Sequence, residues 1–204
     1  QLTQSLGDIK SATVDLDSGA STVFVTALNA DTSNLMEGKF GHPESSRVEK
    51  KYSIAGAEGR LALKEEGVSG VFPTVSNSRW DVALYPQIPL VLRVNGGMGR
   101  VDLDLSAMTV TSLDIKAGVG SVTVMTPKTG ATKMKINGGI GSATITIPPG
   151  VAARIRVDGG LGGVRVDEAR FPKSGKYFEG ADYASATNKV DIDVNGGVGS
   201  VTVR

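Results

Sequence analysis

Residues 94–103 read Val-Asn-Gly-Gly-Met-Gly-Arg-Val-Asp-Leu, and this stretch decides the fold because similar copies of it follow four more times along the chain. These copies occupy residues 115–124, 136–145, 157–166 and 194–203. Successive copies begin 21, 21, 21 and 37 residues apart. Self-similarity at a fixed period is typical of repeat architectures, in which each unit buries its apolar face against the next. The sequence therefore predicts an array of stacked units.

Each copy is predicted to form two β-strands around a glycine turn. Apolar and polar residues alternate on both sides of the glycines, so one face of each strand should be buried. The glycines supply the positive φ angles of a sharp corner, and Pro127 and Pro148–Gly150 mark a second corner. The residues predicted to point inward are Leu92, Val94, Leu113, Ile115, Met134, Ile136, Ile155, Val157, Ile192 and Val194 on the first strands, and Val101, Leu103, Val122, Val124, Ala143, Ile145, Val164, Val166, Val201 and Val203 on the second strands.

The favoured fold class is all-β, a single-stranded β-helix (β-solenoid) in which each repeat adds one rung. Its coils would have about 21 residues, with roughly eight to ten rungs in all. An antiparallel meander, in which each glycine turn is a hairpin loop, remains the alternative. Stacking in register is favoured because it would place charges of both signs in one outward column, where opposite neighbours attract. That column would hold Arg93, Asp114, Lys135, Arg156 and Asp193.

Two fainter copies, at residues 16–25 and 54–63, extend the pattern toward the N-terminus. Two gaps in the pattern, one after the first faint copy and one before the last strong copy, are each long enough to hide a degenerate rung. The last copy ends at the C-terminus, where a terminal rung with an exposed strand edge is expected. We expect one continuous domain, with an N-terminal part at 1–80 made of degenerate rungs, regular rungs at 81–204, and an insert at 167–189.

Composition and charge exclude several classes of function. The net charge is +1, without the basic stripe that neutralises phosphates, so no nucleic acid is expected as a partner. Cysteine is absent, which excludes disulfides and thiolate chemistry. No apolar run approaches the roughly 18–20 residues that span a bilayer, and the first residues lack a signal-peptide pattern. Any membrane attachment is therefore expected through a segment that precedes Gln1.

One repeat position carries side-chain oxygens that raise the hypothesis of a row of calcium ligands. Calcium-binding β-helix repeats follow the pattern Gly-Gly-x-Gly-x-Asp, and here the final acid occurs in the first strong copy alone, at Asp102. Asn and Asp also tolerate turn conformations and bond to the backbone there. A structural role is favoured, and no metal or cofactor is predicted. The row consists of Asp17, Asn95, Asn137, Asp158 and Asn195.

Two pairs of carboxylates at i, i+2 spacing, Asp102 with Asp104 and Asp191 with Asp193, are the candidates for acid–base chemistry. Paired carboxylates cleave glycosidic bonds in carbohydrate-active enzymes. A solvent-facing strand that alternates with apolar residues explains both pairs without catalysis. The single histidine, His42, is typical of a loop, and no Ser–His–Asp set is available to it. No catalytic residue is assigned, and the protein is predicted not to be an enzyme.

The insert at 167–189 is the most unusual segment, because it holds four of the chain's ten aromatic residues. Aromatic side chains are enriched at the centres of interaction surfaces. They also serve as a cap that closes the end or covers the side of a solenoid, which is the favoured hypothesis here. The candidate interaction surface consists of Phe171, Tyr177, Phe178 and Tyr183.

Two further stretches suggest a family. Residues 12–40, which end in Leu-Met-Glu-Gly-Lys-Phe, resemble the start of bacterial toast-rack domains, and residues 80–86 with the glycine-rich repeats resemble the rest of that group. The chain is also similar to the C-terminal domain of LiaF-like envelope-stress proteins and to β-solenoid domains regarded as candidate adhesins. This resemblance implies a right-handed β-helix in an extracytoplasmic, membrane-associated setting. It carries no catalytic residue to this chain.

These observations support three hypotheses of function. The first is a non-enzymatic structural or interaction domain of the bacterial cell envelope, in envelope-stress signalling or adhesion, which contacts a protein or polysaccharide partner. The second is a small carbohydrate-active β-helix enzyme that uses one of the aspartate pairs. The third is a self-assembling homo-oligomer joined through the exposed strand edges of its ends.

Overall fold

The computed structural model describes residues 1–41, 46–67, 78–159 and 162–204, so His42 lies outside the described part. Within that part, sixteen strands form one mixed sheet that is not closed. No helix in the described ranges is long and apolar enough to cross a membrane. The strands are β1 (Leu2–Ser5), β2 (Ser11–Asp17), β3 (Thr22–Ala27), β4 (Asn34–Gly41), β5 (Arg47–Ala55), β6 (Glu58–Glu66), β7 (Arg79–Leu84), β8 (Leu90–Asp104), β9 (Val110–Met125), β10 (Ala131–Thr146), β11 (Ala152–Gly159), β12 (Val164–Val166), β13 (Lys173–Ser174), β14 (Tyr177–Glu179), β15 (Lys189–Gly196) and β16 (Val198–Val203).

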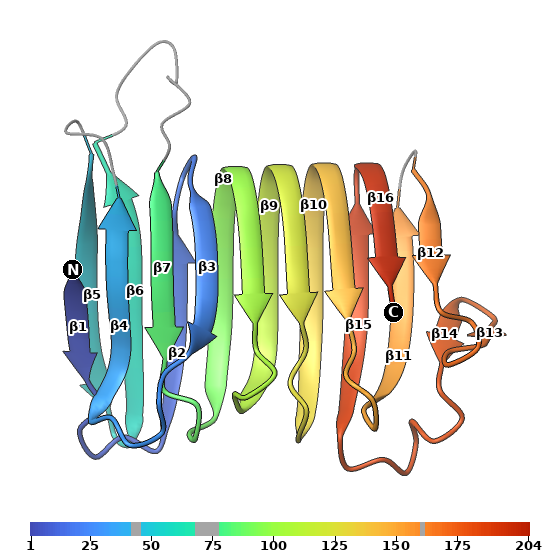
Figure 1. Ribbon diagram of the computed structural model, residues 1–204, viewed down its shortest axis with the longest axis horizontal. Helices are drawn as coiled ribbons and strands as arrows, with labels where there is room; N and C mark the ends of the chain where they lie inside the picture. The colour runs from blue at the N-terminus through green and yellow to red at the C-terminus, as the bar shows by residue number, and fades with distance from the viewer. Residues whose placement is uncertain (42–45, 68–77, 160–161) are drawn as a thin grey trace.

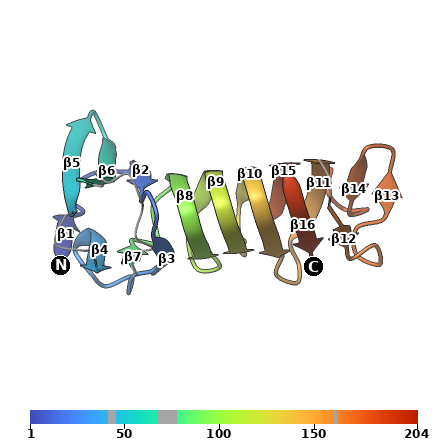
Figure 2. The same ribbon diagram turned by 90° about the horizontal axis from the view of Figure 1, so that it is seen from above.

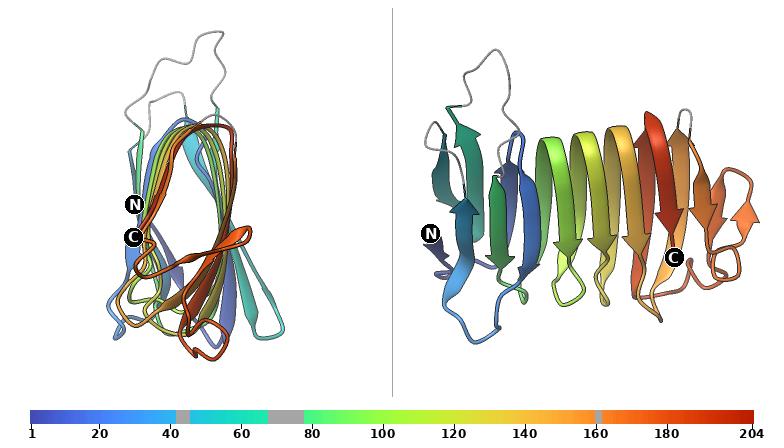
Figure 3. Two further views of the ribbon diagram at one scale, coloured as in Figure 1. Left: turned by 90° about the vertical axis from the view of Figure 1, so that its right-hand side faces the viewer. Right: turned by 45° about the horizontal axis from the view of Figure 1, so that its top comes forward.

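The centre of the sheet is wound from three long strands, β8, β9 and β10. Each runs through one layer, bends at its glycines, and returns through a second layer that faces the first (Figure 1). Seen end-on in Figure 3, the two layers enclose a narrow interior. The three strands pair in parallel with partners 21 residues apart, as Val94 with Ile115 and Ile115 with Ile136. Hairpins would pair antiparallel, so the meander is excluded and a solenoid-like all-β fold is confirmed. The hand of the coil and the number of rungs stay predictions.

The interior is filled by the alternating apolar residues of both layers. In β8, Leu92 and Val94 of the first layer and Val101 and Leu103 of the second are at most 3% exposed. Burial of such side chains contributes about 1.5–3 kcal/mol each, which makes the strand pattern the main determinant of the fold. Among the residues predicted to point inward, Val164 is an exception, being 48% exposed. It lies in β12, for which only one neighbouring strand, β16, is described.

The glycine bend brings the backbones of neighbouring coils unusually close. A Cβ atom on Gly97 would lie 2.7 Å from the carbonyl oxygen of Gly19 in the adjacent coil. The last glycine of the motif has positive φ, +144° at Gly99 and +154° at Gly120, where an L-residue is strained. The predicted corner is therefore confirmed. At Gly99 and Gly120 a positive φ coincides with close approach of the neighbouring backbone, whereas Gly97 has the close approach alone.

The expectation that each repeat adds one rung in sequence order is wrong at both ends of the sheet. The last strands of the chain, β15 and β16, lie between β10 on one side and β11 and β12 on the other (Figures 1 and 2). At the other end, β2 and β3 lie beside β8, while β6 and β7 lie one place farther out. At the C-terminal end, the outer strands β11 and β12 therefore come first in the sequence, and β15 and β16 are inserted between them and β10. At the N-terminal end, the inner strands β2 and β3 come first, and the outer strands β6 and β7 follow.

The outward charges give a physical reason for this order. In the sheet, neighbouring residues of the outward column alternate strictly in sign. In sequence order, Lys135 and Arg156 would have been neighbours, and like charges directly opposite one another are destabilising. The insertion of β15 places Asp193 between them. From β2 to β11 the column reads Asp15, Arg93, Asp114, Lys135, Asp193 and Arg156.

The two long gaps in the repeat pattern do not hide degenerate rungs. The first holds β4, which pairs antiparallel with β1 and β7, and β5, which pairs antiparallel with β6. The second holds β13 and β14, and β14 pairs antiparallel with β11. The last strand, β16, was expected to form a terminal rung with an exposed edge. It instead lies inside the sheet, with β10 on one side and β12 on the other. A single sheet includes strands from both predicted parts of the chain, 1–80 and 81–204.

Candidate functional site

The insert at 167–189 folds back on the edge of the sheet. Gly175, with φ of +61°, allows the tight turn between β13 and β14. Strand β14 then pairs with β11, with Phe178 opposite Ile155. Phe171 is only 2% exposed and belongs to the hydrophobic core. The insert is thus a cap on β11, the arrangement that the sequence favoured.

Arg154 of β11 is the centre of the exposed side of this cap. Its guanidinium donates to both carboxylate oxygens of Asp191 in β15, at 2.6 and 3.3 Å. The same guanidinium lies 5.3 Å from the ring centroid of Tyr177 and 5.0 Å from that of Tyr183. Two lysine ammonium groups lie 5.4 Å from the same two rings. We call this set of alternating cations and rings the cap surface: Lys176, Tyr177, Arg154, Tyr183 and Lys189.

Two groups of the cap surface, Tyr183 and Arg154, have shifted pKa values. Burial raises the pKa of the Tyr183 phenol, and the carboxylate of Asp191 raises it further. The hydrogen bonds to Asp191 raise the pKa of Arg154. Both tyrosines and Lys189 are half-buried. The surface therefore offers the Tyr183 hydroxyl and the Arg154 guanidinium as hydrogen-bond donors, which suit a ligand rich in hydrogen-bond acceptors.

The structure brings together some of the predicted aromatic residues and separates others. Tyr177 and Tyr183 share Arg154, and Phe178 packs half-buried against the core with Lys173 5.8 Å from its ring. Phe171 lies below the surface. Sequence reasoning missed the cationic members of the cap surface. For Arg154 the sequence did contain a signal of exposure, because this residue occupies an outward repeat position, two residues before Arg156.

The four aspartates proposed for acid–base chemistry are all engaged by neighbouring groups. Oδ2 of Asp102 lies 2.6 Å from Nε of Arg100. Asp104 accepts a 2.6 Å hydrogen bond from the hydroxyl of Ser106. The ion pairs of the other two, Asp191 with Arg154 at 2.6 Å and Asp193 with Arg156 at 3.1 Å, join adjacent strands. These contacts give each carboxylate a structural function in the outer surface of the sheet.

The row of side-chain oxygens at one repeat position, proposed above as calcium ligands, is aligned across neighbouring strands as predicted. One member of the aligned row is a cation, Lys116. Asn137 is the register partner of Lys116 on one side and of Asn195 on the other, and its Oδ1 accepts a 3.4 Å hydrogen bond from the amide of Asn195. Asp158 pairs with Arg156 at 3.0 Å. Among the described residues, no group of three or more His, Cys, Asp or Glu side chains could hold a metal ion. The amide contact fits the stacked turn that the sequence favoured.

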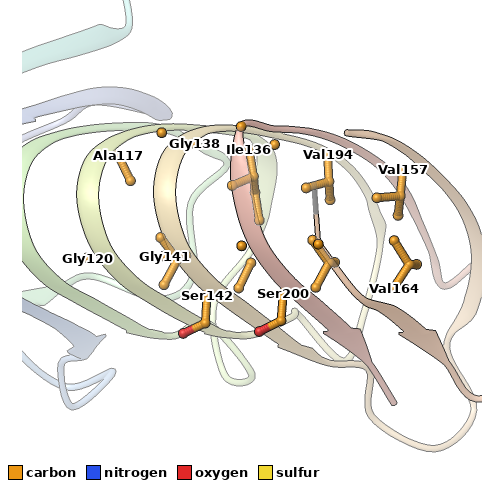
Figure 4. A pocket seen from close by; sticks show the side chains of 18 of the residues that line it. Ala117, Gly120, Ile136, Gly138, Gly141, Ser142, Val157, Val164, Val194 and Ser200 are labelled. Atoms are coloured by element: carbon orange, nitrogen blue, oxygen red, sulfur yellow. The ribbon is translucent and has the colours of Figure 1, made fainter. Parts of the chain in front are cut away.

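A cavity of about 130 Å³ lies under the glycine bends (Figure 4). Its walls are glycines and small or branched apolar residues, among them Ala117, Ile136, Val157 and Val194. Ser142 and Ser200 are its polar members (Figure 4). The cavity follows from the bend, because glycines at a corner leave no side chains to fill the space beneath it.

The parallel coils, the antiparallel covers at both ends and the cap surface together define a solenoid-like structural or interaction domain. The sequence matches the family described as the N-terminal domain of toast_rack, DUF2154, over residues 2–146. The chain therefore belongs to the toast-rack family. No curated protein matches the sequence.

Two solved structures are similar to this chain. One is the crystal structure of a candidate cell adhesion protein from Clostridium sporogenes, with 23% identity and a TM-score of 0.88, covering 99% of this chain and 96% of that chain. The other is a candidate adhesin from Bacteroides fragilis, with 9% identity and a TM-score of 0.33, covering 100% of this chain and 95% of that chain. The first likeness establishes the fold, and the second is too distant to add to it.

Proposed function

We propose that this chain is a non-enzymatic interaction domain of the bacterial cell envelope, which binds a polysaccharide through the cap surface. The observation that carries the proposal is the alternation of two tyrosine rings with three cations around Arg154. The name of the Clostridium structure supports a location outside the cytoplasm and a function in adhesion. The toast-rack family supports a domain whose function is contact rather than turnover.

The chemistry of the cap surface favours a polysaccharide over a protein. Arginine and tyrosine present several hydrogen-bonding groups beside apolar ring surface, which matches the mixture of hydroxyl groups and apolar ring faces on a sugar. The three cations exceed the two nearby carboxylates, Asp191 and Glu179, so acidic sugars are favoured over neutral ones. The cap surface is also held by core contacts on the far side of the insert, which lowers the ordering cost of binding.

The test is binding of the full chain to purified acidic cell-wall polysaccharide, measured by co-sedimentation or calorimetry. Replacing both tyrosines, Tyr177→Ala with Tyr183→Ala, should reduce binding at least tenfold, because stacking residues contribute about 1.4 kcal/mol or more at such sites. Tyr85→Ala is the matched control, since Tyr85 is a half-buried tyrosine near the end of β7, outside the cap. It should leave binding unchanged.

Point variants are preferable to deletion of the insert, because deletion would also remove Phe171 from the core and expose the edge of β11. Circular dichroism of each variant confirms that the sheet is intact. Unchanged binding by the double tyrosine variant would refute the proposal. Capture of a protein, with no binding to polysaccharide, would reassign the partner.

A further inference from the structure

The last coil of the chain occupies a slot between two others. We define the C-terminal coil as residues 189–203, which contain β15 and β16. It is hydrogen-bonded on one side to β10 and on the other to β11 and β12. It is joined to β14 by residues 180–188. Its place is therefore a slot with two strand edges, each of which matches a parallel strand.

The walls of this slot and the C-terminal coil carry opposite charges on the outer surface. Asp191 pairs with Arg154 at 2.6 Å and Asp193 with Arg156 at 3.1 Å. On the opposite wall, Lys133 and Lys135 are the register partners of the same two aspartates. The slot thus recognises a strand with two outward carboxylates at i, i+2 spacing.

Closure of an empty slot on itself would bring like charges together. The 21-residue period would allow β11 to stack directly on β10 with its inward residues matched, Met134 beside Ile155. The same register would place Lys133 beside Arg154 and Lys135 beside Arg156, two like-charge contacts on one surface. An empty slot therefore favours the acidic coil over collapse.

We propose that this slot accepts the C-terminal coil of a second copy of the chain, so that two copies form a dimer by exchanging coils. An exchanged coil makes the same contacts as the resident one, which keeps the free-energy cost of exchange low. The link at 180–188 connects β14 to the coil and contains consecutive turns, with Tyr183 N–H donating to Gly180 and Ser185 N–H to Asp182. Opened, its nine residues would reach about 30 Å.

These 204 residues contain no cysteine, which allows a direct test. Ser142 in β10 and Ser200 in β16 are register partners, and Ser142 is also the partner of Ser121 in β9. A Ser142→Cys chain is mixed with a Ser200→Cys chain, incubated in urea just below the unfolding transition, diluted and oxidised. Exchange predicts a disulfide-linked dimer, measured by non-reducing electrophoresis. The control mixture, Ser142→Cys with Ser121→Cys, pairs two central coils that cannot exchange.

The yield of linked dimer relative to the control mixture decides the outcome. A several-fold excess in the Ser142/Ser200 mixture supports exchange, and equal yields overturn it. A second arm adds Asp191→Lys and Asp193→Lys to the Ser200→Cys chain, which should lower the yield to the control level. An unchanged yield in that arm would refute charge recognition by the slot.

Discussion

The carbonyl oxygen of Gly99 lies where a Cβ atom on Gly120 would have to be, and Gly120 also has φ of +154°. Gly120→Ala should therefore lower the free energy of unfolding by about 2–3 kcal/mol, because it combines a backbone clash with a strained dihedral angle. Gly138→Ala is the matched control in the next coil, since a Cβ there would meet nothing within 4 Å. It should change stability by at most about 0.5 kcal/mol. Urea unfolding measures both, and equal losses would contradict the prediction.

Which single residues could be placed from sequence depended on whether they belong to the repeat. The period put Leu92 and Val94 inside correctly, because burial of one strand face is a local property. In the insert there is no period, so Phe171 in the core and Tyr177 at the surface could not be told apart. The contact of Arg154 with Tyr183 depends on the path of the insert across the sheet edge, which no local pattern contains.

At the scale of the elements, β15 is held between two basic strands by alternating charge. Asp193→Lys should lower the free energy of unfolding by about 1–2 kcal/mol, since it exchanges two attractive neighbours, Lys135 and Arg156, for two repulsive ones. Asp193→Asn, which removes the attraction without adding repulsion, should cost about 0.5 kcal/mol. The difference between the two variants in the free energy of unfolding should become smaller in about 1 M salt, where the screening length falls to about 3 Å.

Denaturant unfolding at low and high salt checks this prediction. A loss for Asp193→Lys that equals the loss for Asp193→Asn would show that the sign of the charge does not matter. The insertion itself was not predicted, because the inward residues fit either order of stacking. The outward signs did contain the information: in sequence order they place Lys135 next to Arg156, and only insertion of β15 separates the two.

At the scale of the whole molecule, the fold is solenoid-like, and antiparallel strands pair with its outer coils at both ends. β1, β4 and β5 cover the outer coil at one end, and β13 and β14 cover β11 at the other. The sequence predicted the solenoid because the repeat involves many residues, which all indicate the same fold. The covers have no repeat, so the sequence predicted degenerate rungs in the N-terminal part and a cap at 167–189, but not the antiparallel strands that form them.

The position of the C-terminal coil predicts an unusual response to truncation. In an ordinary repeat protein, loss of the last unit removes one interface. Here, truncation after residue 188 empties a slot inside the sheet, so the shortened chain should lose its cooperative unfolding transition. Adding Arg154→Asp and Arg156→Asp to the shortened chain should restore a transition, because β11 could then stack on β10 with carboxylates beside Lys133 and Lys135.

The same two arginine changes in the full chain are the matched control. There they would face Asp191 and Asp193, so they should destabilise the domain. The two arginine changes should therefore stabilise the truncated chain and destabilise the full one. Circular dichroism during urea unfolding measures both effects. An effect of the same sign in both chains would show that charge does not determine the order of the coils, and that the order depends on the connections alone.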